Sequence, residues 1–277
     1  MTSKRARFDV TVTEVEAPSG KTAEDEPVPP WVREPARFVN AADVVRLRPA
    51  VSAADLPLGS TPSFTPEFLN QHFEDEAIAL PEGDRPLRIE VLYGASSLKL
   101  HVSSDRPMEG AVEEVMYAFA AQLSAVESDA AAVLTGGPVT AADLSAYGDA
   151  VGAYTVAAAA GGGKRDGCEV RCGALSSSEA AAALNEGLQS LMRFEIDGHS
   201  PIDPTEERWR LFSVWNTGPE GDAGMALAPQ LVGAATVFLF LRWIEGRARL
   251  VLKVCVCVCV CARICIRTHV LYTCVCV

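Results

Sequence analysis

The sequence is short of basic residues. It has 24 Lys and Arg against 36 Asp and Glu, which gives a formal net charge of -12 over 277 residues. Nucleic acids are bound largely through Lys and Arg on their phosphates, so this deficit argues against nucleic acid as a direct ligand. It indicates instead a surface that attracts basic partners. The length is enough for one large domain or two small ones with a sizeable core.

Cysteine is scarce over most of the chain. Of the nine cysteines, only Cys168 and Cys172 lie before the stretch 254–277, so a disulfide framework is excluded. A zinc site at these two positions would need a second Cys or His pair at ligand spacing, and His199 stands alone, so we expect ordinary thiols. The early basic residues of MTSKRARFDV have no apolar run behind them, so we expect no secretory signal, no membrane association and an intracellular protein.

Hydrophobic periodicity predicts the main elements. RIEVLYG and LKLHV alternate as strands joined by a turn at 94–97, and AYTVAAAAGGGKRDGCEVRC reads as two strands around a loop. MEGAVEEVMYAFAAQL and SSSEAAAALNEGLQSLMRFEID carry apolar stripes at helical spacing. RWRLFSVW, LVGAATVFLFLRW and RARLVLKV follow as an antiparallel meander.

Helices followed by antiparallel strands predict an α+β fold. Residues 1–37 are rich in Glu, Pro and Lys without an apolar period, which indicates a disordered leader. We expect an N-terminal α/β domain at 38–150, a second domain at 151–252 and a low-complexity Val-Cys tail at 253–277.

Two short motifs match nucleotide-binding patterns without their context. GGGK at 161–164 is followed by Arg165 and Asp166, whereas a phosphate loop needs Ser or Thr and then a helix. QLVGAA at 230–235 fits the Q/R-x-x-G-x-G/A turn that binds the pyrophosphate of acetyl-CoA at a helix N-terminus. TVFLFLRW follows it and predicts a strand, so we expect neither motif to bind phosphate.

Two longer stretches carry a family resemblance. FTPEFLNQHFEDEAIAL with the following PLRIEVLYGASSLKLHV, and SLMRFEIDGHSPIDPTEERWRLFSVW, resemble the catalytic subunit of type B histone acetyltransferases. The most specific part is Ile202-Asp203 followed by Glu207-Arg208-Trp209 and an aromatic strand. The resemblance runs from about residue 41 to residue 250.

The resemblance implies a chemistry and a setting. The family transfers acetyl from acetyl-CoA to lysines of the histone H4 N-terminal tail, without a metal, after a carboxylate general base has removed the ammonium proton. The second domain would be the first half of a GCN5-related acetyltransferase domain. A WD40 histone-chaperone subunit is the implied partner, and nucleus and cytoplasm are the implied locations.

The resemblance also implies site residues. Asp197 stands in place of a glutamate considered an auxiliary catalytic carboxylate. Phe238, Leu239 and Phe240 replace a Tyr-rich strand against the substrate, so the hydroxyls of that strand are missing. The full set of residues implied to contact the histone tail is Asp75, Glu76, Trp209, Phe238, Leu239 and Phe240.

After Leu252 the sequence departs from the family. The acetyl-CoA loop, the following helix and the main general-base glutamate have no counterpart, and VCVCVCVC begins at residue 254. A DNA tract of repeating GT reads as Val-Cys, so we expect a coding sequence read into a repeat, and a truncated chain with little or no acetyltransferase activity.

Two other functions stay open. One is a non-catalytic module that binds the histone tail. The other is a Cys-rich metal-binding protein, although Val alternation holds the tail thiols on one flat face, whereas tetrahedral sites usually have a turn between ligand pairs.

Overall fold

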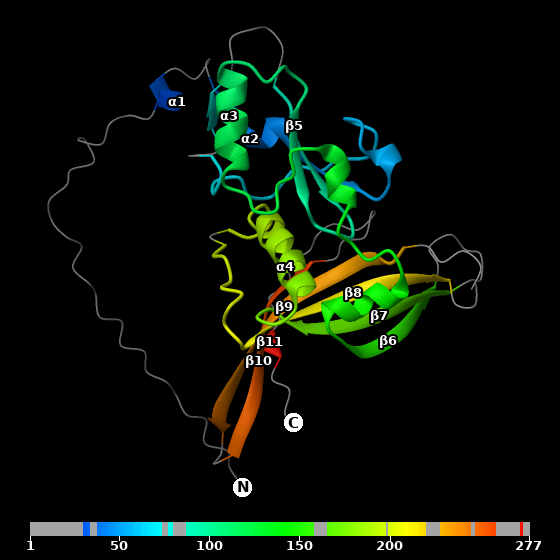
Figure 1. Cartoon of the computed structure of the whole chain (residues 1–277). Helices are drawn as coiled ribbons and strands as arrows, with labels where there is room; N and C mark the ends of the chain where they lie inside the picture. Colours follow the sequence, from blue (N-terminus) through cyan, green and yellow to red (C-terminus); the bar gives the residue numbers. More distant parts are fainter. Residues whose placement is uncertain are drawn as a thin grey trace, which may run out of the picture.

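The structure, a computed structural model, describes residues 30–33, 38–73, 77–79, 87–157, 165–197, 199–219, 228–244, 247–258 and 272–273. Within them the chain forms two-, three- and six-stranded sheets and a few helices, which is a mixed α and β fold of the α+β kind. Figure 1 shows the smaller sheets and the six-stranded sheet as separate layers with the helix α4 (Glu179–Met192) between them.

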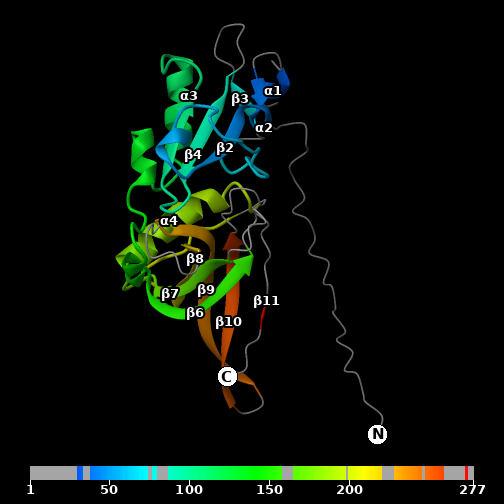
Figure 2. The same ribbon diagram turned by 90° about the vertical axis from the view of Figure 1, so that its right-hand side faces the viewer.

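The N-terminal sheet has the strand order β2-β4-β5, formed by β2 (Val45–Ala50), β4 (Ile89–Gly94) and β5 (Leu100–Ser104). β2 and β4 are parallel, and β4 and β5 form an antiparallel hairpin (Figure 2). Every residue of β4 is buried because this central strand is covered on both faces.

Shorter elements surround this sheet. β1 and β3 pair with each other as an antiparallel ribbon. The elements are α1 (Pro30–Arg33), β1 (Phe38–Asn40), α2 (Ala41–Val44), β3 (Ala77–Ala79), α3 (Ala111–Ala120) and the 3-10 helices η2 (Ala53–Asp55), η4 (Ala130–Leu134) and η5 (Ala141–Tyr147).

A buried ion pair fixes the loop after β2. The guanidinium of Arg48 lies 2.6 Å from a carboxylate oxygen of Glu90, and both side chains are excluded from solvent. Arg48 also donates to the Ser60 hydroxyl at 2.9 Å and to the Leu56 carbonyl at 3.2 Å. A buried charge is tolerated when it is paired and hydrogen-bonded, so Arg48 ties residues 51–61 to the sheet.

The six-stranded sheet is antiparallel throughout, in the order β11-β10-β9-β8-β7-β6. α4 connects β7 to β8, and its N-cap is Ser178, whose hydroxyl accepts from the Ala181 amide at 3.1 Å. The strands are β6 (Asp149–Ala157), β7 (Arg165–Ala174), β8 (Trp209–Pro219), β9 (Gln230–Ile244), β10 (Arg247–Val258) and β11 (Tyr272–Thr273).

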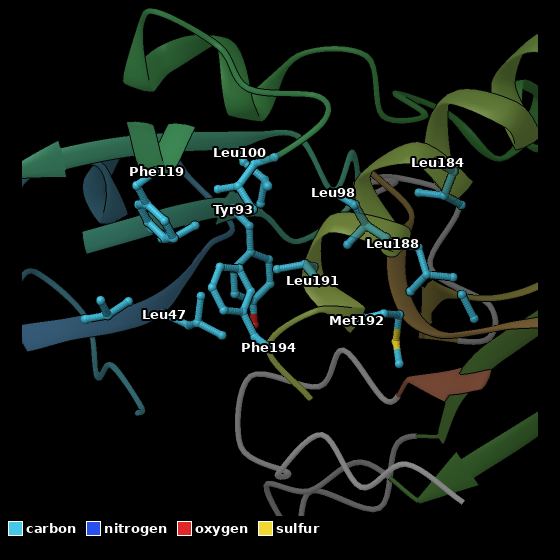
Figure 3. Close-up of a cluster of buried hydrophobic side chains, with 14 of the residues drawn as sticks. Leu47, Tyr93, Leu98, Leu100, Phe119, Leu184, Leu188, Leu191, Met192 and Phe194 are labelled. Carbon is cyan, nitrogen blue, oxygen red and sulfur yellow. The ribbon is translucent and has the colours of Figure 1, made fainter. Parts of the chain in front are cut away.

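One hydrophobic cluster joins the layers through α4. Leu184, Leu188 and Leu191 of the helix are buried in it, together with Leu47 and Leu100 from the N-terminal sheet. Leu211 and Trp215 of β8 belong to the same cluster. Figure 3 shows the α4 side chains facing those of the N-terminal sheet, with Phe194 close to Tyr93. The two expected domains therefore share a core within the described residues.

Most expected elements are confirmed. The hairpin β4-β5, the helices α3 and α4, the strands β6 and β7 and the meander β8-β9-β10 lie where the periodicity predicts them. Residues 141–147 form the 3-10 helix η5. Cys168 and Cys172 lie on β7, and neither forms a disulfide with another described residue. The leader, apart from 30–33, and the GGGK motif lie outside the described residues, as does most of the Val-Cys tail.

Candidate functional site

The segment that follows α4 is bound to the N-terminal part of the molecule by hydrogen bonds. The Phe194 carbonyl accepts from the amides of Glu67 and Phe68 at 3.0 and 2.9 Å. The Gln71 side chain donates to the Ile196 carbonyl at 2.7 Å. We call residues 67–73 and 193–197 the junction, because through them the N-terminal region meets the end of α4.

Glu195 is the buried acid of the junction. The residue is only 7% exposed. Burial, and to a lesser extent the nearby Glu67 charge, together raise the pKa of Glu195 to about 7. A carboxyl group that titrates near neutral pH can accept a proton from a substrate and release it again, which is the requirement for a general base.

Two neutral groups belong to the surroundings of the junction. Burial and the Glu195 charge raise the pKa of Tyr93, so its phenol stays protonated. His72 stacks on Phe194 at 4.6 Å between ring centroids, and neither ring nitrogen has a hydrogen-bond partner among the described residues. Burial lowers the pKa of His72 to about 4, so the imidazole is uncharged at neutral pH.

The expected carboxylate Asp197 has a different environment. Its side chain is exposed, and the Asn70 amide donates to its Oδ1 at 2.9 Å. This contact links Asp197 to the same loop that meets Glu195. Asp197 therefore lies at the solvent side of the junction. The buried acid of the junction is Glu195, which the family resemblance did not indicate.

Aromatic rings gather where β8 and β9 pair. Trp209 is the first residue of β8 and lies opposite Phe238 of β9, with ring centroids 4.8 Å apart. The Arg208 guanidinium lies 4.6 Å above the Phe238 ring and binds the Glu206 carboxylate at 2.9 and 3.1 Å. Trp209 is half-buried against the main core, so it presents only part of its ring to solvent.

The other implied contact residues divide into described and undescribed ones. The Leu239 amide donates to the Arg208 carbonyl at 3.0 Å, and its side chain is on the opposite face of β9 from Phe238 because side chains alternate along a strand. Phe240 is within β9, but its side chain is outside the description. Asp75 and Glu76 lie outside the described residues.

The QLVGAA motif does not form an acetyl-CoA turn. QLVGAA forms the start of β9, and residues 230–238 pair with β8, so this motif opens into a strand as expected. Its backbone is therefore not the turn into a helix that binds a pyrophosphate. In the described part of the chain, no group of three or more His, Cys, Asp or Glu could hold a metal ion. No helix there is both long and apolar enough to span a membrane.

Comparisons with known proteins add no relative. No protein-family model matches the chain, and no curated protein matches it significantly.

Proposed function

We propose that this chain is related to the catalytic subunit of type B histone acetyltransferases and binds a basic peptide, such as the histone H4 N-terminal tail, through Glu195 of the junction and the aromatic rings at the start of β8. The observation that supports this most is Glu195, a buried carboxyl group with its pKa raised to about 7 directly after α4. It stands within the stretch SLMRFEIDGHSPIDPTEERWRLFSVW that carries the resemblance.

The chemistry open to Glu195 is proton acceptance from a lysine. An ammonium group that enters the junction gives one N–H proton to the carboxylate, and the nitrogen lone pair becomes free to attack an acyl carbon. A carboxyl group with a pKa of about 7 is roughly half ionised at neutral pH, so it is available as a base. Transfer of an acyl group also needs a bound acyl donor, and QLVGAA, the start of β9, does not form the turn that would bind acetyl-CoA.

The rings at the start of β8 would hold the peptide. A lysine or arginine side chain packs its methylenes on aromatic rings and keeps its charge in water. Trp209 and Phe238 offer such a surface, and Glu206 beside them is acidic. The formal net charge of -12 favours encounter with a basic tail.

The arrangement of elements supports the coarser part of the proposal. The chain runs β7-α4-β8-β9-β10 with every neighbouring pair of strands antiparallel. This matches the antiparallel meander plus helix expected for the first half of an acetyltransferase domain. A WD40 histone-chaperone partner and a location in nucleus and cytoplasm remain part of the proposal by resemblance.

A peptide titration tests the proposal. Fluorescence anisotropy would measure binding of a labelled H4 tail peptide to the whole chain, with a scrambled peptide of equal composition as the reference. We expect Trp209→Ala to weaken binding by about tenfold, because it removes a ring that packs on the side-chain methylenes. Tyr117→Ala, which removes an exposed ring on α3, is the matched control and should bind as the unmodified chain does.

Two results would overturn the proposal. One is equal binding of the scrambled peptide, since that would leave only non-specific charge attraction. The other is equal weakening by both variants. Addition of acetyl-CoA distinguishes an active acetyltransferase from a module that only binds the peptide. We expect acetyl-CoA neither to tighten peptide binding nor to acetylate the peptide, because QLVGAA does not form the turn that would bind acetyl-CoA.

A further inference from the structure

A cavity of about 210 Å³ lies between the N-terminal half of α4 and the region around the β4-β5 turn. Its apolar wall comes from α4 and from Ala125, and its polar groups come from both sides. The lining residues are Ser97, Lys99, Ala125, Glu127, Gly136, Tyr147, Ala180, Ala183, Leu184 and Glu186. Figure 3 labels Leu184, the lining residue that also belongs to the hydrophobic cluster.

The cavity is separate from the junction. Glu186 lines it, whereas Glu195 belongs to the junction, and at 1.5 Å per helical residue these positions are roughly 13 Å apart along the chain. No residue of the junction lines the cavity. Its ligand is therefore a different question from the proposed function.

The charges around the cavity favour a cation. Lys99 lies 2.7 Å from a carboxylate oxygen of Glu127, and both side chains are about one-third exposed. Glu186 is exposed and has no ion pair among the described residues. One ammonium against two carboxylates leaves a net negative lining. A surface pair such as Lys99 with Glu127 is weak, so an entering cation can share Glu127 and gain Glu186.

The volume limits the ligand to one side chain. Sites for drug-sized ligands and cofactors usually enclose about 300–1,000 Å³, so this cavity is too small for a nucleotide or coenzyme. An alkyl cation the length of a Lys or Arg side chain fits this cavity. Its apolar stem can pack on the alanines and Leu184, and its charged head can pair with the carboxylates.

The backbone around the cavity is held in an uncommon conformation. Both non-glycine residues with positive φ in the described part of the chain are here: Ala125 (φ 57°) lines the cavity and Leu98 (φ 55°) separates the lining residues Ser97 and Lys99. Residues kept in this region despite its steric cost cluster at binding sites.

We infer that this cavity is a binding pocket for one cationic side chain, arginine or lysine, of a peptide partner. The experiment follows backbone amide shifts of the whole chain by nuclear magnetic resonance during titration with N-acetyl-arginine methylamide, its lysine equivalent, and the uncharged citrulline equivalent. We expect one or both cationic probes to shift amides at 97–99, 125–127 and 180–186, with a dissociation constant on the order of millimolar. Citrulline should not shift them.

Variants on and off the cavity complete the test. Glu186→Gln removes the unpaired carboxylate and should weaken binding about fivefold. Ala183→Leu, at an exposed helix position that tolerates a larger residue, should fill the cavity and abolish binding. Glu114→Gln makes the same charge change on the exposed face of α3 and should leave binding unchanged.

Three results would overturn the inference. Equal binding of the citrulline probe is one, and equal binding of the cationic probes by Ala183→Leu and the unmodified chain is another. The third is the absence of any shift of the cavity amides up to about 50 mM probe, because binding that weak is of no use for recognition. The relative effect of arginine and lysine tells which head group the pocket prefers. Binding of the H4 peptide at Trp209 is measured separately, so either proposal can fail alone.

Discussion

At the scale of single residues, the junction holds two buried groups that oppose each other as pH changes. The pKa of His72 is lowered from 6.5 to about 4, so acid favours the unfolded chain below pH 6.5. The pKa of Glu195 is raised from 4.5 to about 7, so alkali favours the unfolded chain above pH 4.5. Between about pH 4.5 and 6.5 both groups lower the stability of the fold, and because one penalty grows as the other shrinks, their sum should change little with pH.

Replacing His72 exposes the acid side of this balance. His72→Phe keeps a ring stacked on Phe194 and edge-on to Phe119, and it removes two buried nitrogens that have no hydrogen-bond partner among the described residues. The variant should gain about 3 kcal/mol more over the unmodified chain at pH 4.5 than at pH 8, where the imidazole is neutral in both states. Urea unfolding at the two pH values measures this. The same gain at both pH values would show that protonation is not involved.

Replacing Glu195 exposes the alkaline side. Glu195→Gln keeps the size of the side chain and removes the charge, so its stability gain should grow from pH 4.5 upward and reach about 3 kcal/mol at pH 8. Glu67→Gln is the matched variant: it leaves the Glu195 carboxyl buried but removes a neighbouring charge, so its gain should be smaller. Urea unfolding at pH 4.5, 6.5 and 8 checks both, and a gain from Glu195→Gln that does not rise with pH contradicts the expectation.

The position of Glu195 also shows where sequence reasoning stops. The stripe Leu184, Leu188, Leu191 and Phe194 predicts the buried face of α4, and the burial of all four residues confirms it. A glutamate between Phe194 and Ile196, at the end of that stripe, was the available signal for a buried acid. Its pKa could not be predicted, because the desolvation depends on residues 67–73, which are distant in sequence.

At the scale of elements, α4 fits against the β4-β5 turn without space for a side chain at Gly187. A Cβ at this position would lie 2.2 Å from the Leu98 carbonyl oxygen. Gly187→Ala should therefore destabilise the fold by about 2–4 kcal/mol, although alanine is the better helix former by about 1 kcal/mol.

Gly152 on β6 is the matched control for that change. Its Cβ would meet nothing closer than 4.0 Å, so Gly152→Ala should be neutral or slightly stabilising. Thermal unfolding followed by circular dichroism compares the two variants. Equal melting temperatures would mean that α4 can move away from Leu98 at little cost.

The sheet pairings differ in how far sequence predicts them. β4 and β5 are neighbours joined by a short turn, so their antiparallel pairing follows from the alternation of RIEVLYG and LKLHV. The parallel pairing of β2 with β4 was not predictable, because the residues between them include two other elements and a long connection. The charge of Arg48 also argued against a buried strand at β2, because the Glu90 carboxylate that pairs with it lies on another strand.

At the scale of the whole molecule, a shared core predicts joint unfolding. Leu188 is fully buried in the cluster that contains both Leu100 of the N-terminal sheet and Trp215 of the six-stranded sheet. Leu188→Ala should lower stability by about 2–5 kcal/mol and loosen both sheets. Native-state hydrogen exchange measures this, with faster exchange expected in both β4 and β8. Faster exchange in one sheet only would show that the two layers open independently.

The place of α4 in the chain has a consequence for protein synthesis. The N-terminal sheet is complete at Ser104, but the helix that covers its apolar face begins at Glu179. At roughly 5–20 residues per second, several seconds of translation separate the two. During that interval Leu98 and Leu100 lack their cover from α4, so the nascent chain presents an apolar surface that chaperones bind.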